Sequence, residues 1–109
     1  MILLWSMSVD KTKILIAEDD FVVAKNLSII LEDKGYEILG TCESGEELLQ
    51  SLSQQLPDLV IMDINLAGLL DGVEATALVK NKTNIPVLYL TSDRDPATLE
   101  RAKLTNPDG

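Results

Sequence analysis

The chain contains no histidine and only one cysteine, Cys42, among its 109 residues. Without histidine, Ser-His-Asp catalysis, Cys-His catalysis and histidine-ligated zinc are all excluded. A single cysteine allows no disulfide within the chain, which agrees with a reducing, cytoplasmic location. A functional site must therefore be sought among other side chains, of which the carboxylates are the most conspicuous.

Basic residues are scarce as well: 9 lysines and arginines stand against 18 aspartates and glutamates, a formal net charge of -9. A surface this negative repels phosphate backbones, so we expect no direct nucleic-acid binding and a preference for cations or basic partner surfaces. No run approaches the roughly 20 apolar residues of a membrane span, so no membrane association is expected. A hydrophobic content of 46% is still enough for the core of one domain.

Short apolar runs alternate along the chain with segments of helical periodicity. The apolar runs predict strands at residues 13–17, 36–40, 58–62 and 85–90. The periodic segments predict helices at residues 20–34, 44–56, 71–81 and 95–105. Such alternation is typical of an α/β fold, a doubly wound parallel sheet with helices on both faces. Right-handed crossovers then place the carboxyl ends of all strands at one edge, where the sites of such sheets lie.

Residues with capping or helix-stopping chemistry delimit the first two predicted helices. Asp20 is the expected N-cap of the first helix, and Gly35 is its expected C-cap. Ser44 and Glu47 match the S-x-x-E capping box at the start of the second helix, and Pro57 is expected to end it. The apolar face of the first helix is formed by Val23, Leu27, Ile30 and Leu31.

Polar side chains follow three of the predicted strands and should meet at one edge of the sheet. These residues are Glu18, Asp19 and Asp20 after the first strand, Asp63 and Asn65 after the third, and Thr91 and Ser92 after the fourth. Carboxylates held close together repel one another and raise one another's pKa. A hard divalent cation relieves this repulsion, and Mg²⁺ suits oxygen ligands in octahedral geometry.

Each of these residues also has a purely structural interpretation. Asp20 is explained by helix capping alone, and Glu18 and Asp19 could be ordinary acidic residues favoured by a helix dipole. Thr91 taken alone is best explained as a core-edge or capping residue. Asp63 is harder to explain in this way, because a charge at the end of an apolar strand is costly unless it is paired. Their convergence on one edge favours the functional interpretation.

Four motifs, ILIAEDD, PDLVIMDINL, DGVEAT and PVLYLTS, occur in this order in the chain. In sequence and spacing they resemble the response-regulator receiver domain of two-component signalling systems, over about residues 13–109. The resemblance implies a flavodoxin-like receiver fold with strand order 2-1-3-4. It also implies a sensor histidine kinase or phosphotransfer protein as partner, and it leaves a homodimer possible.

The resemblance also implies a role for five residues. Glu18 and Asp19 match the acidic pair that holds Mg²⁺, with Glu18 acting directly or through water. Asp63 matches the phosphorylated aspartate and a metal ligand, and Asn65 matches the position whose backbone carbonyl completes the metal shell. Thr91 matches the hydroxyl that hydrogen-bonds the phosphoryl group and reports its arrival.

The chain departs from the family pattern in two places. It ends at Gly109, where the family continues with a fifth strand that carries a lysine and with a fifth helix. We therefore expect residues 13–109 to be a C-terminally truncated receiver domain that follows a poorly ordered extension at residues 1–12. In addition, Leu66-Ala67-Gly68 replaces the usual proline after the phosphorylation site, and the loop that leads to Asp71 is one residue longer than its common form.

Two other classes of function compete with a phosphoacceptor. One is a receiver-like adaptor that binds partners without phosphorylation, which the missing lysine favours. The other is an enzyme with the same topology. A flavin or dinucleotide site needs a glycine- or hydroxyl-rich phosphate loop, whereas the loop after the first strand, Glu18 to Asp20, would repel phosphate. An aspartyl-phosphate phosphatase would usually carry a second aspartate where this chain has Asn65. We therefore expect a signalling domain and not an enzyme.

Overall fold

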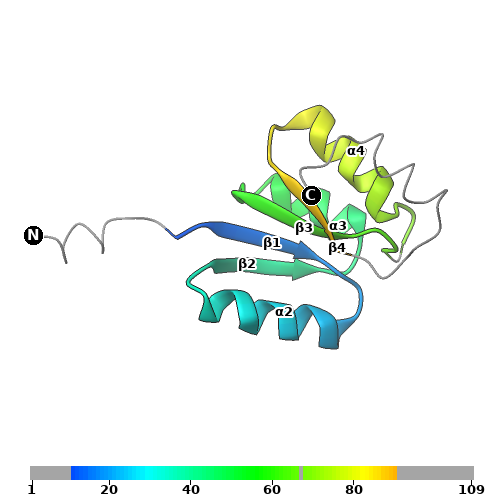
Figure 1. Cartoon of the computed structure of the whole chain (residues 1–109). Coiled ribbons are helices and arrows are strands. Elements are labelled where there is room, and N and C mark those ends of the chain that lie inside the picture. Colours follow the sequence, from blue (N-terminus) through cyan, green and yellow to red (C-terminus); the bar gives the residue numbers. More distant parts are fainter. Residues whose placement is uncertain (1–10, 67, 91–109) are drawn as a thin grey trace, which may run out of the picture.

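The computed structural model describes residues 11–66 and 68–90, and the structural statements below concern those residues. Four parallel strands form one sheet in the order β2-β1-β3-β4, as predicted (Figure 1). The strands are β1 (Lys13–Ala17), β2 (Glu37–Cys42), β3 (Leu59–Asp63) and β4 (Val87–Leu90). The helices are α2 (Phe21–Asp33), α3 (Gly45–Leu52) and α4 (Gly72–Lys82). The helix predicted at residues 95–105 lies outside the described residues.

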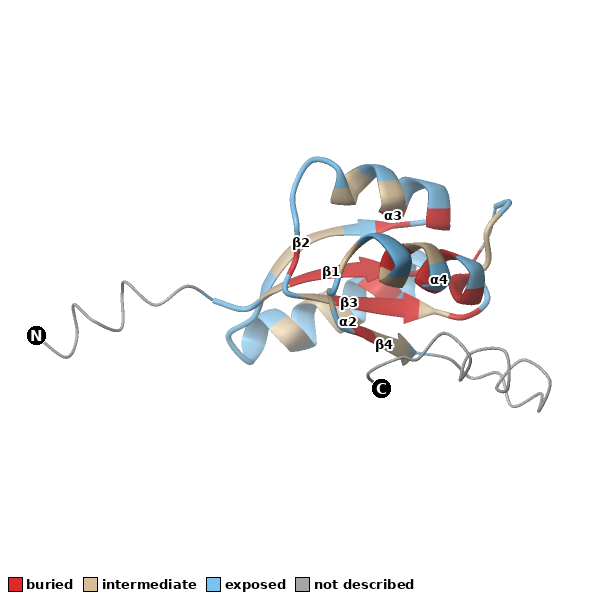
Figure 2. Cartoon of the chain, turned by 90° about the horizontal axis from the view of Figure 1, so that it is seen from above, coloured by how far each residue is buried: buried red, intermediate tan, exposed pale blue. Residues whose placement is uncertain are grey.

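The helices lie on both faces of the sheet, α2 on one face and α3 and α4 on the other (Figures 1 and 2). Side chains of a strand alternate between the two faces, so a strand that is covered on both sides must be apolar throughout. In β1, Leu15 and Ala17 point into the cluster beneath α3 and α4, whereas Ile14 and Ile16 pack against α2. This alternation explains why the central strands read as uninterrupted apolar runs.

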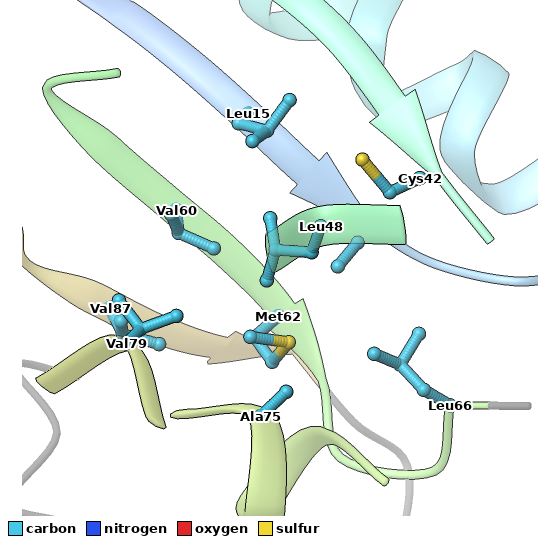
Figure 3. Close-up of a cluster of buried hydrophobic side chains, with 10 residues drawn as sticks. Leu15, Cys42, Leu48, Val60, Met62, Leu66, Ala75, Val79 and Val87 are labelled. Carbon is cyan, nitrogen blue, oxygen red and sulfur yellow. The ribbon is translucent and has the colours of Figure 1, made fainter. Parts of the chain in front are cut away.

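The larger core cluster joins β1, β3 and β4 to both helices of its face (Figure 3). Leu48 of α3 and Val79 of α4 are completely buried against Val60 and Met62 of β3. Burial of each such large side chain stabilises the fold by roughly 1.5–3 kcal/mol. Leu66, which lies beyond the end of β3, also points into this cluster and anchors the connection that follows the strand.

Helix α2 begins and ends as the sequence predicts. The Asp20 side chain accepts hydrogen bonds from the backbone N–H groups of Val22 (2.9 Å) and Val23 (3.2 Å), which have no partner within the helix. At the other end, Gly35 adopts a φ of 97°. The backbone N–H groups of Gly35 and Tyr36 donate to carbonyls in the last turn of α2, which is the Schellman arrangement.

The buried face of α2 differs from the predicted face. Ala24 is buried, and Leu27 and Leu31 pack against Ile14, Ile16 and Ile61. In contrast, Val23 and Ile30 are 39% and 52% exposed, so their assignment to the buried face was wrong. They lie beside the packed stripe, at a flank that no helix of the described residues covers.

Helix α3 is shorter than predicted, because it ends at Leu52 and does not continue to the residue before Pro57. The Ser53 hydroxyl donates to the Gln50 carbonyl oxygen (2.6 Å), which offers the backbone an alternative to another helical turn. Leu56 is exposed. The predicted cap is correct at Ser44, which accepts from the Glu47 N–H (3.1 Å), but the Glu47 carboxylate accepts from the Glu43 N–H and not from Ser44.

Three strands also differ from their predicted limits, β3 by only one residue at each end. Strand β2 runs to Cys42, two residues beyond the prediction, and contains a register shift opposite Ile14 and Leu15 that skips Leu39. Strand β4 begins at Val87, after Pro86, which lacks the N–H group that a ladder requires. None of the helices among the described residues has the length and apolar character needed to cross a bilayer.

Candidate metal centre

Three carboxylates from two strand ends gather at the carboxyl edge of the sheet. Glu18 and Asp19 directly follow β1, and Asp63 is the last residue of β3. Strands β1 and β3 are parallel neighbours in which Ala17 is paired with Met62, so the residues that follow emerge side by side. One carboxylate oxygen from each of the three residues lies within 4.8 Å of the other two.

This spacing suits a hard divalent cation. Oxygens that share one Mg²⁺ at about 2.1 Å are separated by about 3 Å in neighbouring positions and by about 4.2 Å in opposite positions. An upper limit of 4.8 Å is close to that range, so small side-chain adjustments or one bridging water would complete the fit. The ligands are all carboxylates, without thiolate or imidazole among them, which favours Mg²⁺ over zinc or copper.

Glu18 is the buried member of the group, with only 8% of its surface exposed. Its backbone N–H donates to the Cys42 carbonyl oxygen (2.8 Å), which fixes the residue between β1 and β2. Burial raises the pKa of Glu18 to about 7, and its side-chain hydrogen bond to Asp63 contributes in the same direction. In the absence of a cation, burial therefore favours the protonated form of Glu18, and a metal ion bound at this edge would instead favour the charged carboxylate.

Asp63 and Asn65 are linked by the chain turn that follows β3. The backbone N–H of Asn65 donates to Asp63 Oδ1 (3.1 Å), which orients the carboxylate. Asn65 is exposed, and the role of its backbone carbonyl as a metal ligand remains a prediction. Thr91, the predicted phosphoryl-sensing hydroxyl, lies outside the described residues, so its position relative to Asp63 also remains a prediction.

Asp20 does not join the carboxylate group. Its side chain caps α2, and its backbone N–H donates to Glu18 Oε2 (3.2 Å). The structural interpretation of Asp20 is therefore correct. Its backbone contact also restrains the buried Glu18 carboxylate.

Two features of the connection between β3 and α4 were missed from the sequence. Asp71 and Glu74 form a complete capping box at the start of α4, for which the D-x-x-E pattern was a usable local signal. Glu46 of α3 accepts a hydrogen bond from the backbone N–H of Leu70 (2.7 Å). These two residues are 24 positions apart, so no local pattern could have indicated their contact.

Known proteins resemble this chain over most of its length. It is 34% identical over 91 residues to the transcriptional regulatory protein PdtaR of Mycobacterium tuberculosis, covering 84% of this chain and 44% of that protein. It is 35% identical over 92 residues to a protein-glutamate methylesterase/protein-glutamine glutaminase of Halobacterium salinarum, covering 82% of this chain and 26% of that protein. The chain thus spans less than half the length of these curated relatives.

Solved structures agree with this likeness. The signal receiver domain of a modulated diguanylate cyclase from Desulfovibrio desulfuricans superposes with a TM-score of 0.85 at 41% identity, over 90% of this chain and 78% of that one. The chemotaxis protein CheY4 of Vibrio cholerae superposes with a TM-score of 0.80 at 26% identity, over 90% and 82% of the two chains. The family described as "Response regulator receiver domain" matches residues 14–106. With its parallel sheet and strand order 2-1-3-4, the chain belongs to the response regulator receiver domain family.

Proposed function

We propose that the chain is the phosphoacceptor of a two-component phosphorelay and that Asp63 receives the phosphoryl group. The observation that carries the proposal is the gathering of Glu18, Asp19 and Asp63 at the carboxyl edge of the sheet. Glu18 is buried and its pKa is raised chiefly by that burial, so its charged form is disfavoured unless a cation binds beside it. A cation site beside a half-buried aspartate is what phosphoryl transfer to that aspartate requires.

Within this proposal, Asp19, Asp63 and the Asn65 carbonyl bind Mg²⁺ directly, and Glu18 binds it directly or through water. When bound, the ion would supply charge neutralisation for the equatorial oxygens of the transferring phosphoryl group. The hydrogen bond from the Asn65 N–H orients the Asp63 carboxylate for this contact.

The proposed donor is a phosphohistidine on a sensor histidine kinase or a phosphotransfer protein. One oxygen of the Asp63 carboxylate attacks phosphorus in line and forms a new O–P bond. The N–P bond of the donor breaks at the same centre, and the departing imidazole keeps the bonding electron pair and takes up a proton. The product is an acyl phosphate on Asp63, and the Thr91 hydroxyl would hydrogen-bond it and convey its arrival to the rest of the protein.

This assignment makes the chain a signalling domain of the cytoplasm and not an enzyme with its own substrate. Among its relatives is the CAI-1 autoinducer sensor kinase/phosphatase CqsS of Vibrio cholerae, which is 36% identical over 91 residues. Receiver-like sequences thus occur in kinase-linked proteins as well as in regulators. This distribution supports a kinase or phosphotransfer protein as the partner of this chain.

The test is incubation of the full chain with acetyl phosphate and Mg²⁺, followed by intact-protein and peptide mass spectrometry. A mass gain of one phosphoryl group on Asp63 is expected, and Asp63→Asn should abolish it while the far-ultraviolet circular dichroism spectrum is retained. Asp33→Asn, which alters an exposed carboxylate in the last turn of α2, serves as the matched control and should be labelled normally. A chain that binds Mg²⁺ but gains no phosphoryl group would instead support a phosphorylation-independent adaptor.

Binding of Mg²⁺ is tested separately by thermal unfolding in chelator and in Mg²⁺. A ligand that binds only the folded state stabilises it by about 2.7 kcal/mol at a hundredfold excess over Kd. The midpoint should therefore rise by roughly 10–20 °C at this excess, with a heat of binding in calorimetry. An unchanged midpoint together with no heat of binding would refute the metal site.

A further inference from the structure

The connection between β3 and α4 is tied to the first turn of α3 by the side chain of Glu46. Glu46 Oε1 accepts a hydrogen bond of 2.7 Å from the backbone N–H of Leu70, across 24 residues of sequence. Hydrogen bonds to a charged acceptor are stronger than those between neutral groups. The contact is therefore a specific tie between two segments that meet only in the folded protein.

The backbone of the connection passes directly over this carboxylate at Gly68. Gly68 has a φ of 97°, and a Cβ at this position would lie 2.6 Å from Glu46 Oε2 and 3.3 Å from Ser44 Cβ. Glycine therefore meets two needs at once, because it tolerates the left-handed conformation and leaves space for the carboxylate. Glu46 thus contacts the connection at two points, Gly68 and Leu70.

Close packing beneath the tie leaves the connection little freedom to shift toward α3. Gly45 is buried at the start of α3, and a Cβ there would lie 3.0 Å from both Leu70 Cβ and Ala75 Cβ. The first turn of α3 therefore packs closely against Leu70 and against the first turn of α4. Leu69, by contrast, is 90% exposed, so the tip of the connection contributes little packing of its own.

The connection between β3 and α4 begins and ends beside Asp63. Asn65 donates its N–H to Asp63 Oδ1 (3.1 Å), and the Gly72 N–H donates to the Ile64 carbonyl oxygen (2.7 Å). A displacement at Leu70 would therefore be transmitted within two residues to the backbone beside Asp63. The Asn65 carbonyl, the proposed metal ligand, directly follows Ile64, to which Gly72 is hydrogen-bonded.

We infer that Glu46 is a positioning residue for the Asp63 site and holds the connection in the shape that the metal shell requires. The inference rests on the proposed function, because it assigns Glu46 a part in Mg²⁺ binding and phosphorylation at Asp63. Glu46 does not belong to the group of Glu18, Asp19 and Asp63, and it acts only through the backbone of Leu70 and Gly68.

The neighbouring Glu47 provides a matched control. Both glutamates lie in the first turn of α3, where the helix dipole favours a negative side chain. Glu47 accepts from the Glu43 N–H (3.1 Å), which is a contact local to the start of the helix. Replacement of either residue by alanine removes one charge and one side-chain hydrogen bond, but only Glu46→Ala releases the connection.

The experiment compares Glu46→Ala, Glu46→Gln and Glu47→Ala in the full chain. Calorimetry gives the Kd for Mg²⁺, labelling with acetyl phosphate gives the phosphorylation rate, and amide hydrogen exchange reports the protection of the Leu70 N–H. For Glu46→Ala we expect faster exchange at Leu70, an unchanged circular dichroism spectrum and about tenfold weaker Mg²⁺ binding, within the range seen when outer-shell partners of a metal site are removed. Phosphorylation at subsaturating Mg²⁺ should fall in proportion.

Glu46→Gln keeps an oxygen that can accept from Leu70 and should bind Mg²⁺ within about threefold of the unsubstituted chain. Glu47→Ala should leave the Kd for Mg²⁺ unchanged. If Glu46→Gln and Glu46→Ala weaken Mg²⁺ binding equally, or if Glu46→Ala and Glu47→Ala do so, the lost charge is responsible. Either result would overturn the inference. Normal Mg²⁺ binding in Glu46→Ala would overturn it while the proposed function stands. Absence of Mg²⁺ binding in the unsubstituted chain would refute the proposed function and this inference together.

Discussion

The backbone of Gly72 packs directly against the peptide group of Asp63. A Cβ on Gly72 would overlap the Asp63 carbonyl oxygen and would lie 2.7 Å from both the Asp63 carbonyl carbon and Ile64 Cα. The Gly72 N–H also donates to the Ile64 carbonyl oxygen (2.7 Å). The start of α4 and the end of β3 therefore meet without any side chain between them, and the backbone geometry of the proposed phosphorylation site depends on this contact.

Replacement of Gly72 by alanine should destabilise the fold by about 3 kcal/mol, near the top of the usual range for overpacking. This cost outweighs the gain of about 1 kcal/mol that alanine normally brings to a helix. Gly35→Ala is the control, because Gly35 has a φ of 97° but no atom within 4 Å of the position of a Cβ. It should cost only the conformational strain, about 1–2 kcal/mol. Urea unfolding measures the free energy of unfolding of both variants. An equal loss of stability in Gly72→Ala and Gly35→Ala would contradict the steric explanation.

Thr76 is completely buried in α4, and its hydroxyl has no hydrogen-bond partner in the part of the chain that the structure describes. Thr76→Val keeps the shape of the side chain and removes the polar group, so it should stabilise the protein by about 1 kcal/mol. Thr83→Val provides the opposite case, because the Thr83 hydroxyl donates to the Val79 carbonyl oxygen (3.0 Å) and accepts from the Ile85 N–H (3.2 Å). Thr83→Val should destabilise the fold. A loss of stability in Thr76→Val would show that the hydroxyl has a partner.

The stability of the metal-free protein should fall as the pH rises toward neutrality. Burial, followed by the hydrogen bond to Asp63, raises the pKa of Glu18 in the folded state to about 7, whereas the ordinary value is 4.5. Between these values the folded chain holds a proton that the unfolded chain has released, so the free energy of unfolding decreases with increasing pH. The stabilisation from this proton is complete below pH 4.5 and is lost as the pH passes 7.

Urea unfolding in chelator from pH 5 to pH 8 measures this dependence. The glutamine of Glu18→Gln cannot ionise. The difference between the two chains in how the free energy of unfolding changes with pH therefore isolates the contribution of Glu18. Saturating Mg²⁺ should reverse the trend, because the ion requires the deprotonated carboxylate and binds more tightly as the pH rises. Parallel slopes for the two chains would contradict the assignment of this titration to Glu18.

Asp63→Asn should stabilise the metal-free protein at pH 8, where Glu18 is ionised. The substitution removes one of three negative charges whose oxygens lie within 4.8 Å of one another. Like charges at about 4 Å repel by about 1 kcal/mol even in a watery environment, so a gain of about this size is expected. The stabilisation by Mg²⁺ should become much smaller in the same variant. A destabilised Asp63→Asn chain in chelator would show that the Asp63 carboxylate is paired and not repelled.

The fold was largely predictable because its signals are local and periodic. Burial on both faces requires β1 and β3 to be continuous apolar runs, and the caps at Asp20 and Gly35 rest on hydrogen bonds within a few residues. The limits of α3 were not predictable in the same way. Leu56 continues the helical spacing of leucines but finds no core to pack against, and periodicity alone does not reveal which turn of a pattern is buried.

The candidate site was predictable to the level of its three carboxylates. Parallel strands end at one edge, so residues that follow β1 and β3 must lie near one another once the strand order is known. The raised pKa of Glu18 was not predictable for this residue in particular, because the first cause is burial. Burial of Glu18 and exposure of Asp19, its neighbour in sequence, depend on how β1 and β2 pack together.

The sequence by itself determined the alternation of strands and helices, the parallel sheet and the placement of Glu18, Asp19 and Asp63 at one edge, because these follow from side-chain periodicity and chain connectivity. Only the tertiary structure decided which face of α2 is buried, how Gly72 meets the backbone of Asp63 and how Glu46 reaches Leu70. These contacts join segments that are distant in sequence or depend on a close fit between elements. Their energies depend on distances of a few tenths of an ångström, which no one-dimensional pattern encodes.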